Sequence, residues 1–147
     1  ILYFCIGFPM DSTITFAKEL ARKAHKKLLL LMDKDIPYKY VTISHLKEVD
    51  PMLFISYIYY ADCIVTNSFH ATAFSILFHK EFYVETVVKR RERILNLLNL
   101  TGMNDRGLEN GKATNTQVST NWQSVDNKLQ PWIDDSIDYL KFITTGL

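Results

Sequence analysis

Short apolar runs alternate with amphipathic stretches along most of the chain. Continuous apolar runs cover Ile1–Gly7, Leu28–Met32 and Cys63–Thr66. Such runs are typical of strands that are buried on both faces, as in a parallel sheet. A weaker strand pattern covers Tyr38–Ile43, and a further strand is predicted over Phe82–Glu85. The pattern predicts several short strands that are connected through helices.

Helical patterns fill the intervals between these runs. Asp11 or Ser12 can cap a helix that extends to about Lys26. Asp50-Pro51 is a second helix start, because Asp supplies a capping oxygen and Pro suits the first helical position. That helix extends to about residue 60, and two further helices are predicted over residues 68–78 and 89–98. Strands that alternate with helices in this way predict an α/β fold with a parallel sheet and helices on both faces.

The C-terminal part has a different character. Residues 101–120 are polar and contain three glycines, which predicts a loop. Residues 124–144 follow as a final amphipathic helix, which Pro131 either interrupts or begins. Its apolar stripe comprises Leu129, Trp132, Ile133, Ile137, Leu140 and Ile143. We expect residues 1–147 to form a single Rossmann-like domain. The segment 121–147 then packs on this domain or crosses to an N-terminal half outside the sequence.

Composition narrows the class of protein. The chain has 147 residues, of which 48% are hydrophobic and 22% charged, and its formal net charge is +1. A nearly neutral chain offers no overall field for nucleic acid, and the apolar run Pro51–Ala61 is far shorter than the ~20 residues of a membrane span. Cys5 and Cys63 lie in predicted strands, which indicates buried free thiols, and no metal-ligand spacing is present. Because the chain begins with Ile and a strand pattern, we expect a fragment of a longer protein.

The stretch ADCIVTNSFHATAFSILF, residues 61–78, places a histidine where a predicted strand passes into a helix. In an open parallel sheet, ligands bind beyond the carboxyl ends of the strands, beside helix N-termini that favour anions. Asn67, Ser68 and His70 would lie at that edge. An unperturbed imidazole titrates near pH ~6.5, so it can exchange a proton at neutral pH. The alternative is structural: Ser68 caps the helix, and His70 packs with one ring nitrogen bonded to a carbonyl.

Several segments together carry a family resemblance. They are Asp50-Pro51, Ala61–His70, Phe74-Ser75-Ile76, Lys80-Glu81-Phe82, Arg93–Leu98 and Gly102–Arg106. This order and spacing resembles the C-terminal half of the polysaccharide pyruvyl transferase family. In that family a strand ending in Thr-Asp-Ser-Phe-His precedes a helix, a Lys-Pro-Phe strand, an Arg-Ile-x-x-Leu-Leu helix and a Gly-x-x-x-Arg segment. This chain departs from the pattern at Asn67 for Asp, Ala71 for Gly and Glu81 for Pro. It also has Ser68 where better-studied members carry Arg.

The resemblance implies a fold and a reaction. The fold would be the C-terminal half of a GT-B-like enzyme with two Rossmann-like halves and a cleft between them. The reaction would transfer a pyruvyl group from phosphoenolpyruvate to sugar hydroxyls of a surface polysaccharide or its precursor. His70 falls on the family's motif histidine and would be the acid or a phosphate donor. Asn67, Ser68, Phe69 and Arg93 would bind the substrate.

Further expectations concern the partners of the protein. The resemblance implies phosphoenolpyruvate as the donor substrate and a saccharide or lipid-linked saccharide as the acceptor, and we expect no cofactor and no metal. A cytoplasmic location, peripheral membrane association of the full-length protein and no nucleic-acid partner complete the expectation. Residues 1–147 alone would lack turnover, because half of the cleft is missing.

Two other readings remain open at this point. A GT-B glycosyltransferase would need a carboxylate after a late strand to bind the ribose of a nucleotide sugar, and Glu85 is the candidate. A non-catalytic domain of the same fold would need neither. Arg93 has a structural alternative of its own, because an arginine on an amphipathic helix can simply face solvent.

Overall fold

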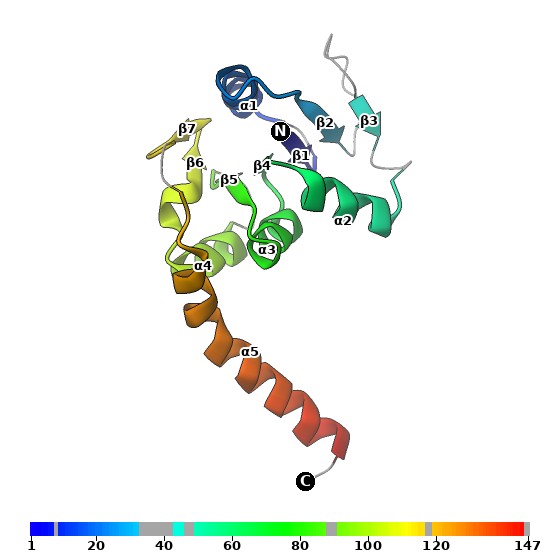
Figure 1. Cartoon of the computed structure of the whole chain (residues 1–147), viewed down its shortest axis with the longest axis vertical. Helices are drawn as coiled ribbons and strands as arrows, with labels where there is room; N and C mark the ends of the chain where they lie inside the picture. The colour runs from blue at the N-terminus through cyan, green and yellow to red at the C-terminus, as the bar shows by residue number, and fades with distance from the viewer. Residues whose placement is uncertain (8, 33–42, 46–48, 88–90, 117–118, 146–147) are drawn as a thin grey trace.

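In the described part of the chain, seven short strands form one sheet at the centre of the molecule (Figure 1). The computed structural model describes residues 1–7, 9–32, 43–45, 49–87, 91–116 and 119–145. Along the sheet the strands are ordered β3-β2-β1-β4-β5-β6-β7. Their bounds are β1 Leu2–Cys5, β2 Leu29–Met32, β3 Ile43–His45, β4 Cys63–Thr66, β5 Glu81–Glu85, β6 Gly107–Glu109 and β7 Lys112–Ala113. The first six are parallel, and their order 3-2-1-4-5-6 is compatible with a Rossmann-like fold.

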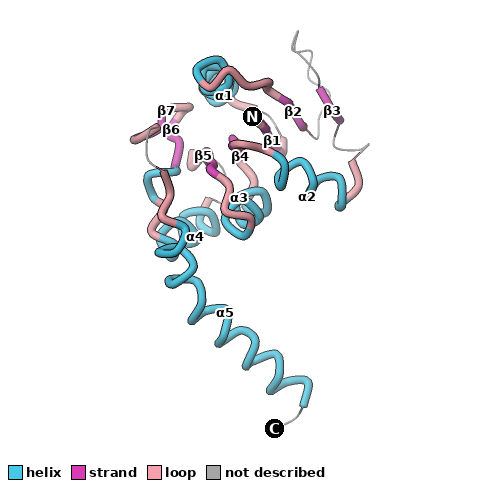
Figure 2. Tube along the Cα trace, in the orientation of Figure 1, coloured by secondary structure: helices cyan, strands magenta, loops and turns pink. Residues whose placement is uncertain are grey.

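Among the described residues the chain forms five α-helices, most of which follow a strand (Figure 2). They are α1 Asp11–Lys23, α2 Pro51–Tyr60, α3 Phe69–Leu77, α4 Glu92–Thr101 and α5 Trp122–Thr145, with a short 3-10 helix at Asn104–Arg106. The predicted Asp50 cap is confirmed, since its Oδ1 accepts a hydrogen bond from the backbone N–H of Leu53 at 2.8 Å. The prediction that Asp11 or Ser12 caps the first helix is wrong. Met10 is the N-cap of α1 and makes no side-chain cap bond, and the helix ends at Lys23.

Two apolar clusters cover the two faces of the sheet. Alternate strand residues point to opposite faces, so Leu2 and Phe4 of β1 join one cluster while Tyr3 and Cys5 join the other. The first cluster also receives buried residues of α2, α3, α4 and the start of α5, and the second receives those of α1. Figure 1 shows α1 on one side of the sheet and α2, α3 and α4 on the other. The expected helices on both faces are therefore confirmed.

Three parts of the fold differ from the expectation. The sheet is mixed rather than parallel throughout, because β7 pairs antiparallel with β6. β6, β7 and the 3-10 helix all lie within residues 101–120, which we predicted as a loop. Strands of two or three residues are too short to show the alternation of apolar and polar residues that predicts a strand. The helix predicted from residue 89 begins at Glu92, and residues 88–90 lie outside the described part, as do residues 38–42 of the weak strand.

The long helix α5 packs only at its beginning. Val125 is buried, and Trp122 and Leu129 contact the same cluster beside α3 and α4. Beyond Pro131, which lies inside the helix, α5 leads away from the sheet (Figure 1). Its predicted apolar stripe is therefore largely exposed, with Trp132 at 62% and Leu140 at 55%. Among the described helices none combines the length and apolar character of a membrane span.

Cys63 provides a test of the packing of β4. Its side chain is buried, and burial, with a smaller contribution from Glu81, raises the pKa of the thiol to about 12. The thiolate is the reactive form of cysteine. We therefore expect no carboxymethylation of Cys63 by iodoacetate at pH about 8 in the native protein, and rapid labelling in denaturant. Peptide mass spectrometry measures both. Labelling of native Cys63 at the rate of an unfolded chain would contradict this packing.

Candidate functional site

The site predicted from sequence lies where the chain direction across the sheet reverses. β1 is adjacent to β2 on one side and to β4 on the other, so the connections leaving β1 and β4 diverge at their carboxyl ends. In open α/β sheets such a switch point is the usual place for a ligand. α1 follows β1, α3 follows β4 and α4 follows β5, so the N-termini of these helices lie at this carboxyl edge, as does that of α2 after β3.

Ser68 and His70 occupy the predicted positions in α3. Ser68 is the N-cap, and its Oγ accepts from the backbone N–H of Ala71 at 3.5 Å. The Ser68 N–H donates to Thr66 Oγ1 at 3.0 Å, and its side chain is buried. His70 lies in the first turn of α3 and is exposed. The imidazole therefore emerges where a parallel strand passes into a helix and is not sealed in the core, which contradicts the alternative of a packed histidine.

Phe69 connects His70 with Arg93. The rings of Phe69 and His70 are 5.7 Å apart at their centroids and meet edge to face. The guanidinium carbon of Arg93, in the first turn of α4, lies 4.9 Å from the centroid of the Phe69 ring. A cation at this distance from an aromatic face is attracted to it. The structure thus brings a histidine from one helix start and an arginine from the next to the same aromatic ring.

Asn67 completes the group at the exit of β4. Its Oδ1 accepts from the backbone N–H of Ile6 at 2.9 Å, and its Nδ2 donates to the Ile6 carbonyl at 2.9 Å. The same Nδ2 lies 3.2 Å from Cys5 Sγ. Ile6 follows β1, so this side chain joins the exits of the two central strands. A direct contact of Asn67 with substrate stays a prediction.

Glu85 has a role that we did not predict. It ends β5 and is 1% exposed. Its Oε2 accepts from Thr13 Oγ1 at 2.7 Å and from the Gly111 N–H at 3.3 Å, while its Oε1 accepts from the N–H groups of Val87 and Asn110 at 3.2 and 3.3 Å. A buried carboxylate is stabilised by such donors. Its oxygens join α1 to the turn between β6 and β7, so donors of the protein itself engage this carboxylate.

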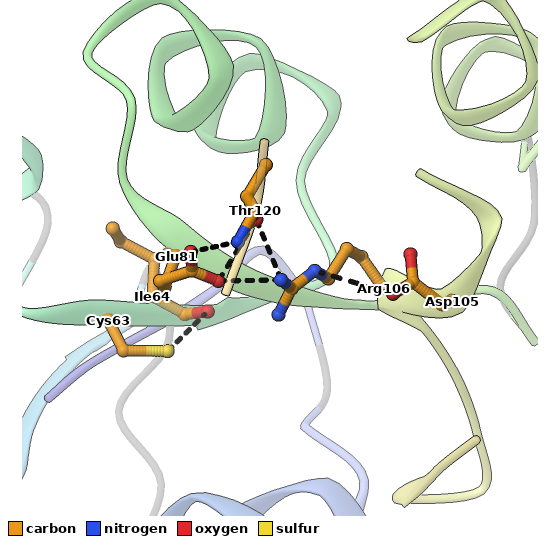
Figure 3. A network of polar contacts seen from close by, with 6 residues as sticks. All are labelled: Cys63, Ile64, Glu81, Asp105, Arg106 and Thr120. Atoms are coloured by element: carbon orange, nitrogen blue, oxygen red, sulfur yellow. Dashed lines mark hydrogen bonds and ion pairs between the residues drawn. The ribbon is translucent and has the colours of Figure 1, made fainter. Parts of the chain in front are cut away.

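A second polar network lies at the opposite, amino edge of the sheet (Figure 3). Arg106 is 2% exposed and contacts Glu81 Oε2 through one guanidinium nitrogen at 2.7 Å, and the same nitrogen donates to Thr120 Oγ1 at 2.7 Å. Glu81 also accepts from the Thr120 N–H at 3.1 Å. Glu81 begins β5, whereas His70 follows the end of β4, so this network is remote from the histidine. It anchors the segment that enters α5.

The cavities found among the described residues are not lined by His70. A cavity of about 660 Å³ lies at the amino ends of β1 and β2, beside Leu29, Tyr57 and Tyr60. That edge is opposite to the one where His70 emerges. Within the described part of the chain, no three His, Cys, Asp or Glu side chains converge as metal ligands.

The comparisons with known proteins decide the family. The model of the family described as polysaccharide pyruvyl transferase matches residues 9–86, slightly more than half of the chain. The chain belongs to the polysaccharide pyruvyl transferase family. Comparisons with curated proteins and with solved structures give no match.

Membership in the polysaccharide pyruvyl transferase family covers most of the site. The match contains α1, α2, β4 and α3, and with them Asn67, Ser68, Phe69 and His70. It begins well before Asp50, where the sequence resemblance was placed, and it ends before Arg93 and Arg106. The family consists of transferases, so a polysaccharide pyruvyl transferase role is supported at the level of the family.

Proposed function

We propose that this protein transfers a pyruvyl group from phosphoenolpyruvate to hydroxyls of a saccharide. The observation that carries the proposal is the exposed His70 in the first turn of α3, beside Phe69 and Arg93. Family membership supports the reaction class and a saccharide acceptor. The donor follows from chemistry, because phosphoenolpyruvate carries a carboxylate and a phosphate that suit cations and helix N-termini.

The reaction requires an acid and an anion site. A proton is added to the vinyl carbon of phosphoenolpyruvate, and a sugar hydroxyl attacks the adjacent carbon. Phosphate then leaves, and a second hydroxyl closes the ketal. One of the two hydroxyl protons balances the new methyl group, and the other balances the phosphate that leaves. An acid within hydrogen-bond reach supports the first step, and cations or N–H donors support the departure of phosphate.

Each site residue then has a separate task. His70 is the acid that protonates the vinyl carbon, or the donor that binds the phosphate. Arg93 binds an anionic group of the donor, and the backbone N–H groups of Phe69 and His70 in the first turn of α3 add hydrogen-bond donors. Ser68 itself caps the helix through the Ala71 N–H, which fixes the start of this turn.

The remaining parts of the proposal concern the complete protein. The acceptor is a saccharide or lipid-linked saccharide of a surface polysaccharide, and the protein acts in the cytoplasm, with peripheral association to the membrane where a lipid-linked acceptor is used. A GT-B-like arrangement would add an N-terminal half as the second wall of the cleft and as a surface for the exposed stripe of α5. No metal or other cofactor takes part in this scheme.

Titration of phosphoenolpyruvate into the protein tests the donor. We expect saturable binding, and we expect Arg93→Met to weaken it about tenfold, since one charge-assisted contact is lost. Arg22→Met is the matched control, because Arg22 is exposed in the last turn of α1 and lies toward the amino edge. Isothermal titration calorimetry measures both variants and the unaltered protein.

Two results would contradict the proposal. Saturable binding of a nucleotide diphosphate sugar, without binding of phosphoenolpyruvate, would favour a glycosyltransferase. Absence of binding for both ligands would favour a non-catalytic domain. Equal weakening by Arg93→Met and Arg22→Met would show that only the overall charge of the protein matters.

A further inference from the structure

Asn67 holds together two segments that end on different strands. The last paired residues of β1 and β4 are Phe4 and Thr66. Beyond them the main chains diverge toward α1 and α3, and the Asn67 side chain replaces the main-chain pairing with its two bonds to Ile6. Both bonds are 2.9 Å long, which is the usual length of a strong N–H···O hydrogen bond.

The contact is located between the residues that would flank a ligand. Ile6 is followed by Gly7, whose φ of +80° turns the chain toward α1. Asn67 is followed by the cap Ser68 and, two residues later, by His70 in the first turn of α3. The Asn67 amide therefore sets the spacing between the turn after β1 and the helix start that presents the histidine.

An amide is chemically suited to this position. It donates through nitrogen and accepts through oxygen at the same time. An ionised aspartate only accepts, so it could receive the Ile6 N–H but would place its second oxygen against the Ile6 carbonyl. A protonated aspartate offers one donor and one acceptor, as the amide does. The residue that distinguishes this chain from the usual Asp of its family thus makes a bond that an ionised Asp cannot make.

We propose that Asn67 is a positioning residue that fixes the Ile6–Gly7 turn against the first turn of α3, so that both sides of the phosphoenolpyruvate site are preformed. This inference rests on the proposed function. A site that is preformed does not spend binding free energy on ordering its own groups. Loss of the amide contact therefore weakens binding of the donor without removal of any group that binds it.

Two measurements on Asn67→Leu test the inference. Leu has about the same size and makes no hydrogen bond. We expect hydrogen exchange of the Ile6 amide to accelerate at least about tenfold without ligand, since its acceptor is lost. We expect the dissociation constant of phosphoenolpyruvate to rise about tenfold. Asp50→Ala is the control, because it removes a helix cap on α2 and should change neither quantity.

Asn67→Asp gives a second, pH-dependent test that also applies if Asn67→Leu fails to fold. At pH about 7.5 we expect faster Ile6 exchange than in the unaltered protein and weaker donor binding. Both differences should narrow as the pH is lowered to about 4 and below, the range in which an aspartate becomes protonated, because protonation restores a donor. The unaltered protein at each pH is the reference, since phosphoenolpyruvate itself titrates.

The outcomes separate the inference from the function on which it rests. Absence of phosphoenolpyruvate binding by the unaltered protein overturns the proposed function and, with it, the inference. Binding that weakens in Asn67→Leu with unchanged Ile6 exchange would make Asn67 a direct ligand. Faster exchange with unchanged binding would make the contact structural only. Each of the last two results overturns the inference alone.

Discussion

His70→Gln is expected to lower the turnover of pyruvyl transfer by about a thousandfold, within the range that general acid catalysis contributes. Glutamine has a similar length and can still donate a hydrogen bond, but it cannot supply a proton to the vinyl carbon. His70 is exposed in the first turn of α3, so the exchange leaves no cavity in the core. Steady-state kinetics of the complete protein with phosphoenolpyruvate and a saccharide acceptor, followed by phosphate release, measures the effect.

His79→Gln is the matched control for this experiment. His79 follows the other end of the same helix, and its Nε2 lies 2.9 Å from Asp126 Oδ1 of α5. Glutamine can keep a hydrogen bond to this carboxylate, so we expect turnover within about a factor of two of the unaltered protein. A His70→Gln protein that keeps more than about a tenth of the activity would exclude His70 as the acid. A rise in the Michaelis constant alone, with unchanged turnover, would assign it to phosphate binding.

Glu85→Ala is expected to lower the free energy of unfolding by about 3–5 kcal/mol, because several donors would lose their acceptor at about 1–3 kcal/mol for each that stays buried. The substitution leaves the Thr13 hydroxyl and the N–H groups of Val87, Asn110 and Gly111 without their acceptor. Glu85 is 1% exposed, so water has little access to replace the hydrogen bonds of the removed carboxylate. Urea denaturation followed by circular dichroism measures the change.

Glu109→Ala is the control for the loss of a carboxylate. Glu109 lies on the neighbouring strand β6 and is exposed, so we expect a change within about 0.5 kcal/mol. A Glu85→Ala protein that is as stable as Glu109→Ala would show that the hydrogen bonds from Glu85 to α1 and to the turn after β6 do not stabilise the fold. Glu85→Gln separates charge from shape. In either orientation its amide nitrogen would face at least one N–H donor, so we expect part of the loss to remain.

Local signals account for the elements that the sequence predicted well. β4 matches its predicted bounds, and α3 lies within one residue of its own, because a buried apolar run ends at a polar Thr-Asn-Ser that caps the next helix. The Asp50-Pro51 start of α2 has the same origin, since its cap bond joins residues three apart. Such contacts can be inferred from sequence because both partners lie within one helical turn.

Contacts between distant residues account for what the sequence did not reveal. Glu85 looked like a ribose ligand because nothing adjacent in sequence pairs with it, whereas its partners are Thr13 and the turn at Asn110 and Gly111. Arg106 lay in a polar stretch, and its burial depends on Glu81 and Thr120. The short strands β6 and β7 likewise exist through pairing with β5 and with each other.

The sequence by itself determined that the chain is α/β, that a histidine follows the central strand β4, and that the segment around it resembles a pyruvyl transferase. These conclusions depend on periodicity, caps and motif residues, all of which are local. The tertiary structure alone decided which groups surround that histidine. Arg93 is close to Phe69 because β4 and β5 are neighbours, and Asn67 bonds Ile6 because β1 lies on the other side of β4. The order of strands in the sheet results from packing of the whole chain, and local sequence does not encode it.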